Sequence, residues 1–405
     1  MNKYIQDCIR NNSRNVLKGL TRPQQKAVSE IIRGLFTAGE PILRHLAQDS
    51  TKTAKKQGEK YAHHLGNVSL RGKAEEMAMK RAKAEVRKTT IIAYDLTDIS
   101  KDCAKKMEKL GRAWDGSRKR AVNGYELHGV GINNLLTRLE VHDDNLYTRN
   151  QVRKQIVTKI SRELEGKGIW VFDRGNDDKA FFGFLRHFLN AEFIARVKVN
   201  RQVVIAKTGA LEKAGNMKPG RYRVYFMNRF NNRVDTRGLY TLTISKHLED
   251  HEPIRLLSHL KAGYSDRQIV TMYLERWGVE NLLKRIKQKF ELEKIRVLNH
   301  QKFVNLVALV QFAVLVSAIT FMRIQQATIF LITGVLLLYK KFLRLKNLGQ
   351  NLDSFITFMR CSLKPLVTRP RDPPGQFSLF SRRQLVKLGS VNYPAAETAG
   401  RLKSE

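Results

Sequence analysis

Cysteine is scarce in this sequence, and its scarcity excludes several classes of protein. The 405 residues contain 3 cysteines, Cys8, Cys103 and Cys361, which lie far apart and lack the spacing of metal ligands. Disulfides and a structural zinc site are therefore not expected. The N-terminal segment 1–12 has no apolar run, so no secretory signal is expected either. These shortages favour a protein of a reducing cytoplasm.

Acidic residues are few relative to basic ones. The sequence has 74 lysines and arginines against 37 aspartates and glutamates, which gives a net charge of +37 spread along the chain. A surplus of this size implies a polyanionic partner, most simply nucleic acid. A non-enzymatic DNA-binding protein would explain the charge equally well, so the charge alone does not predict an enzyme.

Long uncharged segments are also rare, and one of them raises the question of a membrane. Residues 303–322 carry no charged side chain and are long enough to span a bilayer. Four polar side chains dilute this run, at Asn305, Gln311, Ser317 and Thr320. We therefore expect a buried core helix and no membrane partner, with a membrane span as the alternative.

Two acidic residues follow short apolar segments that are typical of buried strands. Asp95 follows Ile91-Ile92-Ala93-Tyr94, and Asp173 follows Ile169-Trp170-Val171-Phe172. In α/β folds the chemistry commonly lies at the carboxyl ends of strands. Each acid taken singly could equally be a turn or cap residue. Together they predict a pair of carboxylates at one edge of a sheet.

A third acid lies in an amphipathic segment, residues 271–290, which the sequence predicts to be one continuous helix. At about 100° per residue, Tyr273, Arg276, Glu280 and Lys287 fall on one narrow stripe. Apolar residues at helical spacing form the neighbouring arc, and we expect Trp277 to be a core residue. A solvated amphipathic helix is the alternative.

Taken together, these residues resemble the DDE transposases of bacterial insertion sequences, in the group with a Tyr-Arg-Glu-Lys signature. Tyr273, Arg276, Glu280 and Lys287 reproduce that signature without a departure. Asp95-x-Thr97-Asp98 and Asp173-Arg174-Gly175 are similar to the family's two aspartate blocks. The resemblance covers roughly residues 20–320.

This resemblance implies an activity, a cofactor and partners. Asp95, Asp173 and Glu280 would hold two Mg²⁺ ions, with Mn²⁺ as a substitute, and Tyr273, Arg276 and Lys287 would contact DNA. The enzyme would cut transposon ends and transfer the 3′-hydroxyl into target DNA, acting as a homodimer on double-stranded DNA in the bacterial nucleoid. A nuclease or resolvase of the same fold, without strand transfer, is the alternative.

The order of predicted elements favours an α/β fold with an RNase-H-like mixed sheet flanked by helices. We expect a helical DNA-binding domain at 1–85 and the first part of the core at 86–198. A basic β-rich insertion follows at 199–260, because residues 197–240 contain ten Lys or Arg against two acids. The core is completed at 261–345. His128, on a predicted strand, is expected to be structural.

The C-terminal region, 346–405, ends in a segment rich in proline that we expect to be a flexible tail. Within it, Gln376, Leu379 and Phe380 form a short peptide that resembles the motif by which bacterial replication proteins dock on the sliding clamp. An extended segment with two adjacent apolar anchors is suited to such docking. A small hydrophobic patch that folds back on the core is the alternative.

Overall fold

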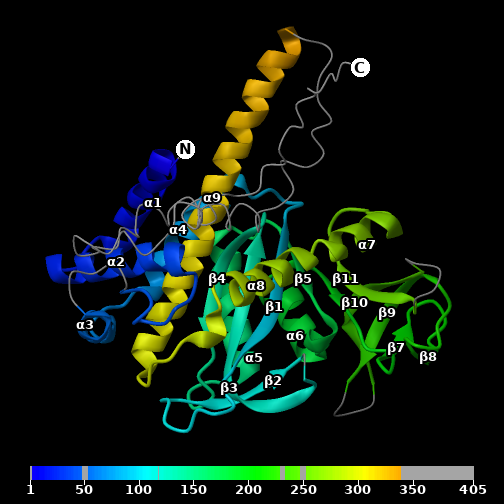
Figure 1. Ribbon diagram of the computed structural model, residues 1–405. Helices are drawn as coiled ribbons and strands as arrows, with labels where there is room; N and C mark the ends of the chain where they lie inside the picture. Colours follow the sequence, from blue (N-terminus) through cyan, green and yellow to red (C-terminus); the bar gives the residue numbers. More distant parts are fainter. Residues whose placement is uncertain (1, 48–52, 117, 229–232, 247–251, 339–405) are drawn as a thin grey trace, which may run out of the picture.

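The computed structural model describes residues 2–47, 53–116, 118–228, 233–246 and 252–338 (Figure 1). Its N-terminal part is helical, with α1 (Asn2–Leu17), α2 (Arg22–Ala38), α3 (Ala54–Gly66) and α4 (Arg71–Glu85). Helix α2 shows how the local sequence fixes these bounds. Thr21 and Gln24 form a capping box at its start, and Gly39 adopts the left-handed conformation at its end.

The central sheet has the strand order expected of an RNase-H-like core. Its first five core strands run β4-β3-β1-β5-β6, where β1 pairs antiparallel with β3 and parallel with β5. The parallel pair β5–β6 is connected through a helix, as such connections require. The bounds are β1 (Ile91–Ser100), β2 (Gly111–Asp115), β3 (Arg120–Ile132), β4 (Leu135–Val141), β5 (Ile169–Phe172) and β6 (Glu192–Arg196).

The basic segment after β6 is rich in strands, and these strands extend the core sheet. Strand β11 pairs antiparallel with β6, and the order continues β11-β10-β9-β7-β8. The inserted strands therefore lie beside the core in one continuous sheet (Figure 1). Their bounds are β7 (Gln202–Ile205), β8 (Leu211–Lys213), β9 (Gly220–Met227), β10 (Val234–Ser245) and β11 (Ile254–His259).

Helices cover both faces of the core sheet. On one face, which we call the back, α5 (Arg149–Glu163) and α6 (Lys179–Gly183) pack on Tyr94 and Phe172. On the front face, α8 (Trp277–Lys289) packs on β1 and β3, and α7 (Asp266–Leu274) packs on Ile169 and Val171. Because side chains alternate along a strand, Tyr94 points to the back and its neighbour Asp95 to the front.

The long apolar helix α9 (His300–Leu338) lies among the N-terminal helices and β4. Within the described residues it is the one helix long and apolar enough to cross a membrane, but 94% of its most apolar stretch is buried inside the protein. Asn305 is satisfied there, since its Nδ2 donates to the carbonyls of Leu65 and Val68 at 2.8 Å. The segment 303–322 is therefore part of the buried core, as the sequence predicts.

Candidate active site

Two of the three predicted acids lie side by side where two parallel strands are paired: Asp173 directly follows the end of β5, whereas Asp95 lies in the middle of β1, which continues to Ser100. The prediction that Asp95 lies at the carboxyl end of its strand is therefore wrong. In the parallel pair β1–β5, Tyr94 is opposite Phe172, and this is the last paired position of β5. The next residue in each segment is an aspartate, Asp95 within β1 and Asp173 just after β5. Tyr94 and Phe172 fill the core on the back face, so both aspartates face the front.

A local hydrogen bond fixes the Asp173 carboxylate. Its Oδ1 accepts from Asn176 Nδ2 at 2.5 Å, across the short turn of 3₁₀ helix that follows β5. Asn176 is itself buried and accepts from Arg153 Nη1 at 2.9 Å. The sequence analysis did not predict a role for Asn176. Its position three residues after Asp173 is a spacing typical of turns and could have indicated one.

Helix α8 brings the third acid to the same face, and two glycines on β3 allow its close approach. Gly129 lies opposite Asp95 in the β1–β3 register. A Cβ at Gly129 would lie 2.8 Å from Leu283 Cδ2, and a Cβ at Gly131 would lie 3.1 Å from Val279 Cβ. The absence of side chains at these positions lets α8 lie against the sheet. Glu280, at the start of α8, is half-exposed above it.

A single guanidinium links two of the acids. Arg276 Nη1 lies 2.6 Å from Glu280 Oε1 and 3.5 Å from Asp95 Oδ2. Burial raises the pKa of Asp95 to about 7; the positive charge of Arg276 opposes this rise, while the Asp173 and Glu280 carboxylates add to it. Asp95 thus senses both other acids, and the three form one electrostatic cluster.

The chemistry of this cluster fits a hard divalent cation. Asp95, Asp173 and Glu280 offer only oxygen donors, which Mg²⁺ and Mn²⁺ prefer. The three carboxylates repel one another, and Arg276 supplies one positive charge against them. A bound divalent cation would relieve the remaining repulsion, so the residues present suit such an ion.

Residues 87–316 match the family described as the transposase DDE domain, and this segment is more than half of the chain. The chain belongs to this family. The predicted membership of the DDE transposases is thereby confirmed. The match contains Asp95, Asp173 and Glu280, and it leaves helices α1–α4 outside.

No curated protein matches this transposase at a significant level. Among solved structures, a cryo-EM structure of the piggyBac transposase synaptic complex with hairpin DNA is similar to it, with a TM-score of 0.49 and 11% sequence identity. The similarity covers 98% of this chain and 84% of that chain.

The prediction of one continuous helix over 271–290 is wrong. Helix α7 ends at Leu274 and α8 begins at Trp277, with a turn at Glu275 and Arg276 between them. In this turn the backbone hydrogen bonds join residues three apart instead of four. For example, Arg276 N–H donates to Tyr273 O at 3.1 Å. The four signature residues therefore do not share one straight stripe. Arg276 still reaches Glu280, because both lie at the first turn of α8.

Two signature residues predicted to contact DNA are engaged within the protein. Tyr273 is buried among the apolar side chains that join α7 to the sheet, so its expected place on a DNA-facing stripe is wrong. Its ring lies 5.6 Å from the Arg276 guanidinium, close enough to support that side chain. Lys287 Nζ pairs with Asp98 Oδ1 at 2.8 Å and with Glu293 Oε1 at 3.2 Å.

Trp277 was expected in the core, and this prediction is also wrong, because the side chain is 55% exposed. The buried face of α8 is set by Val279, Leu282 and Leu283. Trp277 lies two residues before Val279, at about 200° around the helix, so it points away from the sheet. The exposed indole lies next in sequence to Arg276, at the edge of the acidic cluster.

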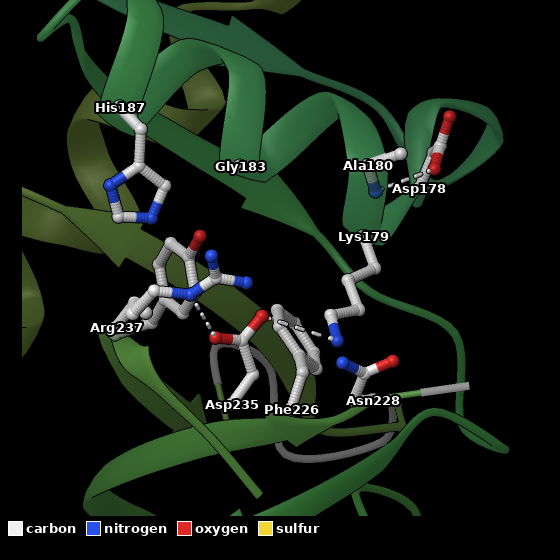
Figure 2. Close-up of a pocket in the computed structure, with 11 residues that line it drawn as sticks. Asp178, Lys179, Ala180, Gly183, His187, Phe226, Asn228, Asp235 and Arg237 are labelled. Carbon is white, nitrogen blue, oxygen red and sulfur yellow. Dashed lines mark hydrogen bonds and ion pairs between the residues drawn. The ribbon is translucent and has the colours of Figure 1, made fainter. Parts of the chain in front are cut away.

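A pocket lies between α6 and the inserted strands β9 and β10 (Figure 2). Lys179, His187 and Arg237 line it, with Phe226 and Tyr240 at its apolar wall. Lys179 and Arg237 both pair with Asp235, so an anion would have to compete for them. The predicted clamp-binding residues Gln376, Leu379 and Phe380, and the whole of 346–405, lie outside the described residues.

Proposed function

We propose that this transposase cuts DNA at the ends of its element and joins the freed 3′-hydroxyl to target DNA. The observation that carries the proposal is the convergence of Asp95, Asp173 and Glu280, from two strands and a helix, on one face of the sheet. Phosphodiester displacement requires an activated nucleophile and a stabilised leaving oxygen. A carboxylate cluster suited to divalent cations supports that chemistry.

Two Mg²⁺ ions, for which Mn²⁺ would substitute, would supply Lewis-acid activation of the attacking oxygen and stabilisation of the leaving oxygen. The protein's own part is to hold the three carboxylates in position. Asn176 fixes Asp173, and the packing of α8 on Gly129 and Gly131 sets the height of Glu280. Arg276 balances the charge of Asp95 and Glu280 before a cation arrives.

Arg276 would take a second role when DNA is bound. Cations at the carboxylates would weaken its hold on Asp95 and Glu280, and its fork of donors suits a bidentate contact with a phosphate. Lys287 would have to leave Asp98 and Glu293 to do the same, so we assign it a positioning role instead. The exposed indole of Trp277 is suited to stacking on a base near the cut.

The rest of the molecule would hold double-stranded DNA through its positive charge. The net charge of +37 and the basic strands β7–β10 support a long phosphate contact, which a homodimer at the bacterial nucleoid would double. In the tail, we keep the sliding clamp as a partner for Gln376, Leu379 and Phe380. A fluorescence titration of purified clamp should show binding that Leu379→Ala/Phe380→Ala abolishes and Leu385→Ala/Leu388→Ala retains.

An in vitro transposition assay tests the proposed reaction. The donor would be a plasmid that carries the element's own flanking sequences, and a second plasmid would be the target. We expect Mg²⁺-dependent end cleavage and sequenced junctions between donor ends and target. Cleaved ends without junctions would favour the nuclease or resolvase, and DNA binding without cleavage would favour an architectural protein. Asp95→Asn serves as the inactive control.

A further inference from the structure

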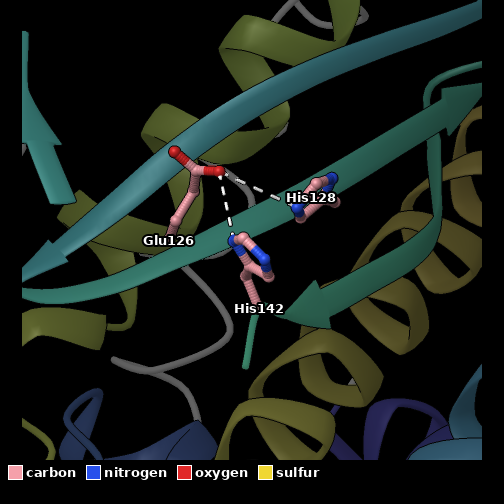
Figure 3. A group of neighbouring side chains, drawn as sticks. All are labelled: Glu126, His128 and His142. Carbon is pink, nitrogen blue, oxygen red and sulfur yellow. Dashed lines mark ion pairs between the residues drawn. The ribbon is translucent and has the colours of Figure 1, made fainter. Parts of the chain in front are cut away.

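A second group of potential metal ligands lies on the back face of the same strands (Figure 3). Glu126 and His128 alternate on β3 and therefore share one face, and His142 follows the end of the neighbouring strand β4. One ligand atom from each lies within 4.8 Å of the others. All three residues are buried, and the DDE chemistry proposed above uses none of them.

The hydrogen bonds of the two imidazoles leave one nitrogen of each facing Glu126. His142 Nε2 lies 2.8 Å from the Tyr147 carbonyl oxygen, which only accepts, so Nε2 carries a proton; in the neutral ring Nδ1 then keeps its lone pair. His142 Nδ1 lies 3.5 Å from Glu126 Oε1. This is the arrangement of a metal-binding histidine, whose other nitrogen donates to a backbone carbonyl.

His128 presents an unsatisfied nitrogen at the same point. The residue is fully buried, its Nδ1 bonds the Tyr94 hydroxyl at 2.5 Å, and its Nε2 has no hydrogen-bond partner among the described residues. Glu126 Oε1 lies 3.8 Å from Nε2, too far for a hydrogen bond. A buried polar atom without a partner is costly, and a cation at this point would satisfy it.

We propose that Glu126, His128 and His142 bind one Zn²⁺ ion, with Asp144 as the fourth ligand. Two imidazole nitrogens and carboxylate oxygens are a ligand set that Zn²⁺ accepts in a tetrahedron. Asp144 Oδ1 lies 3.0 Å from His142 Nδ1, and its side chain is half-exposed, which gives an entry route. Bonds of about 2.0–2.1 Å place tetrahedral ligand atoms about 3.4 Å apart. Three of the six ligand pairs lie at 3.0, 3.5 and 3.8 Å, close to this separation, and the two histidines lie within 4.8 Å of each other.

The arginine that already holds Glu126 is compatible with this ion. Arg149 donates through Nε to Oε1 at 2.7 Å and through Nη2 to Oε2 at 2.5 Å. Each carboxylate oxygen has two lone pairs, so Oε1 can accept from Arg149 and face a cation at once. Arg149 then orients the ligating carboxylate in the way that outer partners of metal sites do.

The ion would connect the β4–α5 segment to the strand that carries Asp95. Tyr147 and Arg149 lie in that segment, and Tyr94 immediately precedes Asp95 on β1. The site is thus structural, and its existence is independent of the reaction proposed above. The alternative is a metal-free site in which His142 is protonated and pairs with Glu126 and Asp144. Glu126, the Tyr147 carbonyl and Asp144 raise the pKa of His142, although its burial opposes this rise.

Zinc titration of the full chain tests the proposal. The background would be Asp95→Asn/Asp173→Asn/Glu280→Gln, which removes the oxygen ligands of the front face, and the protein would first be treated with a chelator. We expect one Zn²⁺ per chain. His142→Gln should weaken binding more than tenfold, because changes in outer partners alone cost about 10–100-fold. His63→Gln, an exposed histidine on α3, should leave it unchanged.

Spectroscopy of the bound metal identifies the ligands without relying on the His142 variant. X-ray absorption of the zinc-loaded background protein should show two imidazole nitrogens, and Co²⁺ in place of Zn²⁺ should give the intense visible bands of a tetrahedral site. Failure to bind zinc, equal affinities for His142→Gln and His63→Gln, or a shell of oxygen atoms alone would overturn the proposal. Circular dichroism of each variant separates loss of the site from loss of the fold.

Discussion

The front and back faces of strands β1 and β3 carry groups of opposite chemical character. On the front, Asp95 joins Asp173 and Glu280, and a guanidinium is the cationic group within reach of Asp95. On the back, one nitrogen from each of two imidazoles faces Glu126. Oxygen donors select hard cations such as Mg²⁺, whereas imidazoles select zinc-like ions.

The difference shows how strand alternation separates two sites that are adjacent in the sequence. Tyr94 and Asp95 are consecutive, yet the Tyr94 hydroxyl bonds His128 on the back while Asp95 faces α8 on the front. A shift of the register by one residue would exchange these roles. If the front is an oxygen-only centre, its activity should depend on its charge balance and on the distance of α8 from the sheet.

The largest effect is expected from the aspartates. Asp95→Asn or Asp173→Asn should lower end cleavage by about 10³-fold or more, because each removes an oxygen ligand where charge develops in the transition state. DNA binding should be retained, since the change removes a negative charge that faces phosphate. Gel assays of cleavage and binding measure both quantities. Near-normal nicking by either variant with Mg²⁺ would remove that residue from the centre.

Arg276→Ala should have the next largest effect, a loss of about 10²-fold in cleavage. The change leaves Asp95 and Glu280 without their shared counter-charge, so the pKa of Asp95 should rise further. It also removes a phosphate contact, so the salt dependence of DNA binding should become shallower. Lys287→Ala should cost less, because Lys287 is held by Asp98 and Glu293. Equal losses for the two variants would contradict this order.

Stability of the metal-free protein should depend on pH through Asp95. Its pKa is about 7 in the folded protein, against 3.8 ordinarily, so the folded state binds the proton more tightly. The stabilisation from the protonated acid is present below pH 4 and is lost as pH rises to 7. Asp95→Asn should therefore raise the free energy of unfolding by about 2–4 kcal/mol more at pH 8 than at pH 4.

Urea denaturation with a chelator present measures this difference. Asp102→Asn, which changes an exposed acid paired with Arg118, is the matched control and should show no comparable rise. If Asp95→Asn and wild type had the same pH dependence, the raised pKa of Asp95 would be refuted.

The smallest effect is expected from a change in packing. In Gly129→Val, a Cβ would lie 2.8 Å from Leu283 Cδ2, so α8 must move away from the sheet and carry Glu280 with it. Misplacement of a catalytic group by less than 1 Å should lower cleavage by about tenfold. Gly116→Val, where nothing lies within 4 Å of the added Cβ, should retain activity. Zinc affinity of the back face should be the same in both variants.

Much of the front face could be predicted from the sequence, because its signals are local. Apolar runs that precede Asp95 and Asp173 predict two buried strands, and the parallel pairing of these strands brings the two acids together. The strand end is correct for Asp173, but β1 continues past Asp95 to Ser100 through its pairing with β3. The break between α7 and α8 could not be predicted, since neither Glu275 nor Arg276 is a residue that interrupts helices. The assumption of one helix placed Tyr273 on the DNA face, whereas the core position expected of Trp277 came from its residue type and not from its place on the helix.

The ligand group on the back face could be predicted only in part, for a different reason. Glu126 and His128 at alternate positions of a strand predict a shared face, and this signal was readable. His142 joins them only through the β3–β4 register, in which His128 lies opposite Glu140. That register shifts between Val130 and Gly131, and such an irregularity cannot be derived from the pattern of residues alone. The position of His142 beside Glu126 and His128 could therefore not be predicted from the sequence.

The most direct test of the account is end cleavage by Glu280→Gln compared with Glu275→Gln. Both changes remove one negative charge from the same junction, but only Glu280 shares Arg276 with Asp95. With Mg²⁺ and the element's own ends, we expect Glu280→Gln to lose cleavage by about 10³-fold and Glu275→Gln to remain close to wild type. Cleavage by Glu280→Gln at the rate of Glu275→Gln would contradict the assignment of Asp95, Asp173 and Glu280 as one catalytic centre.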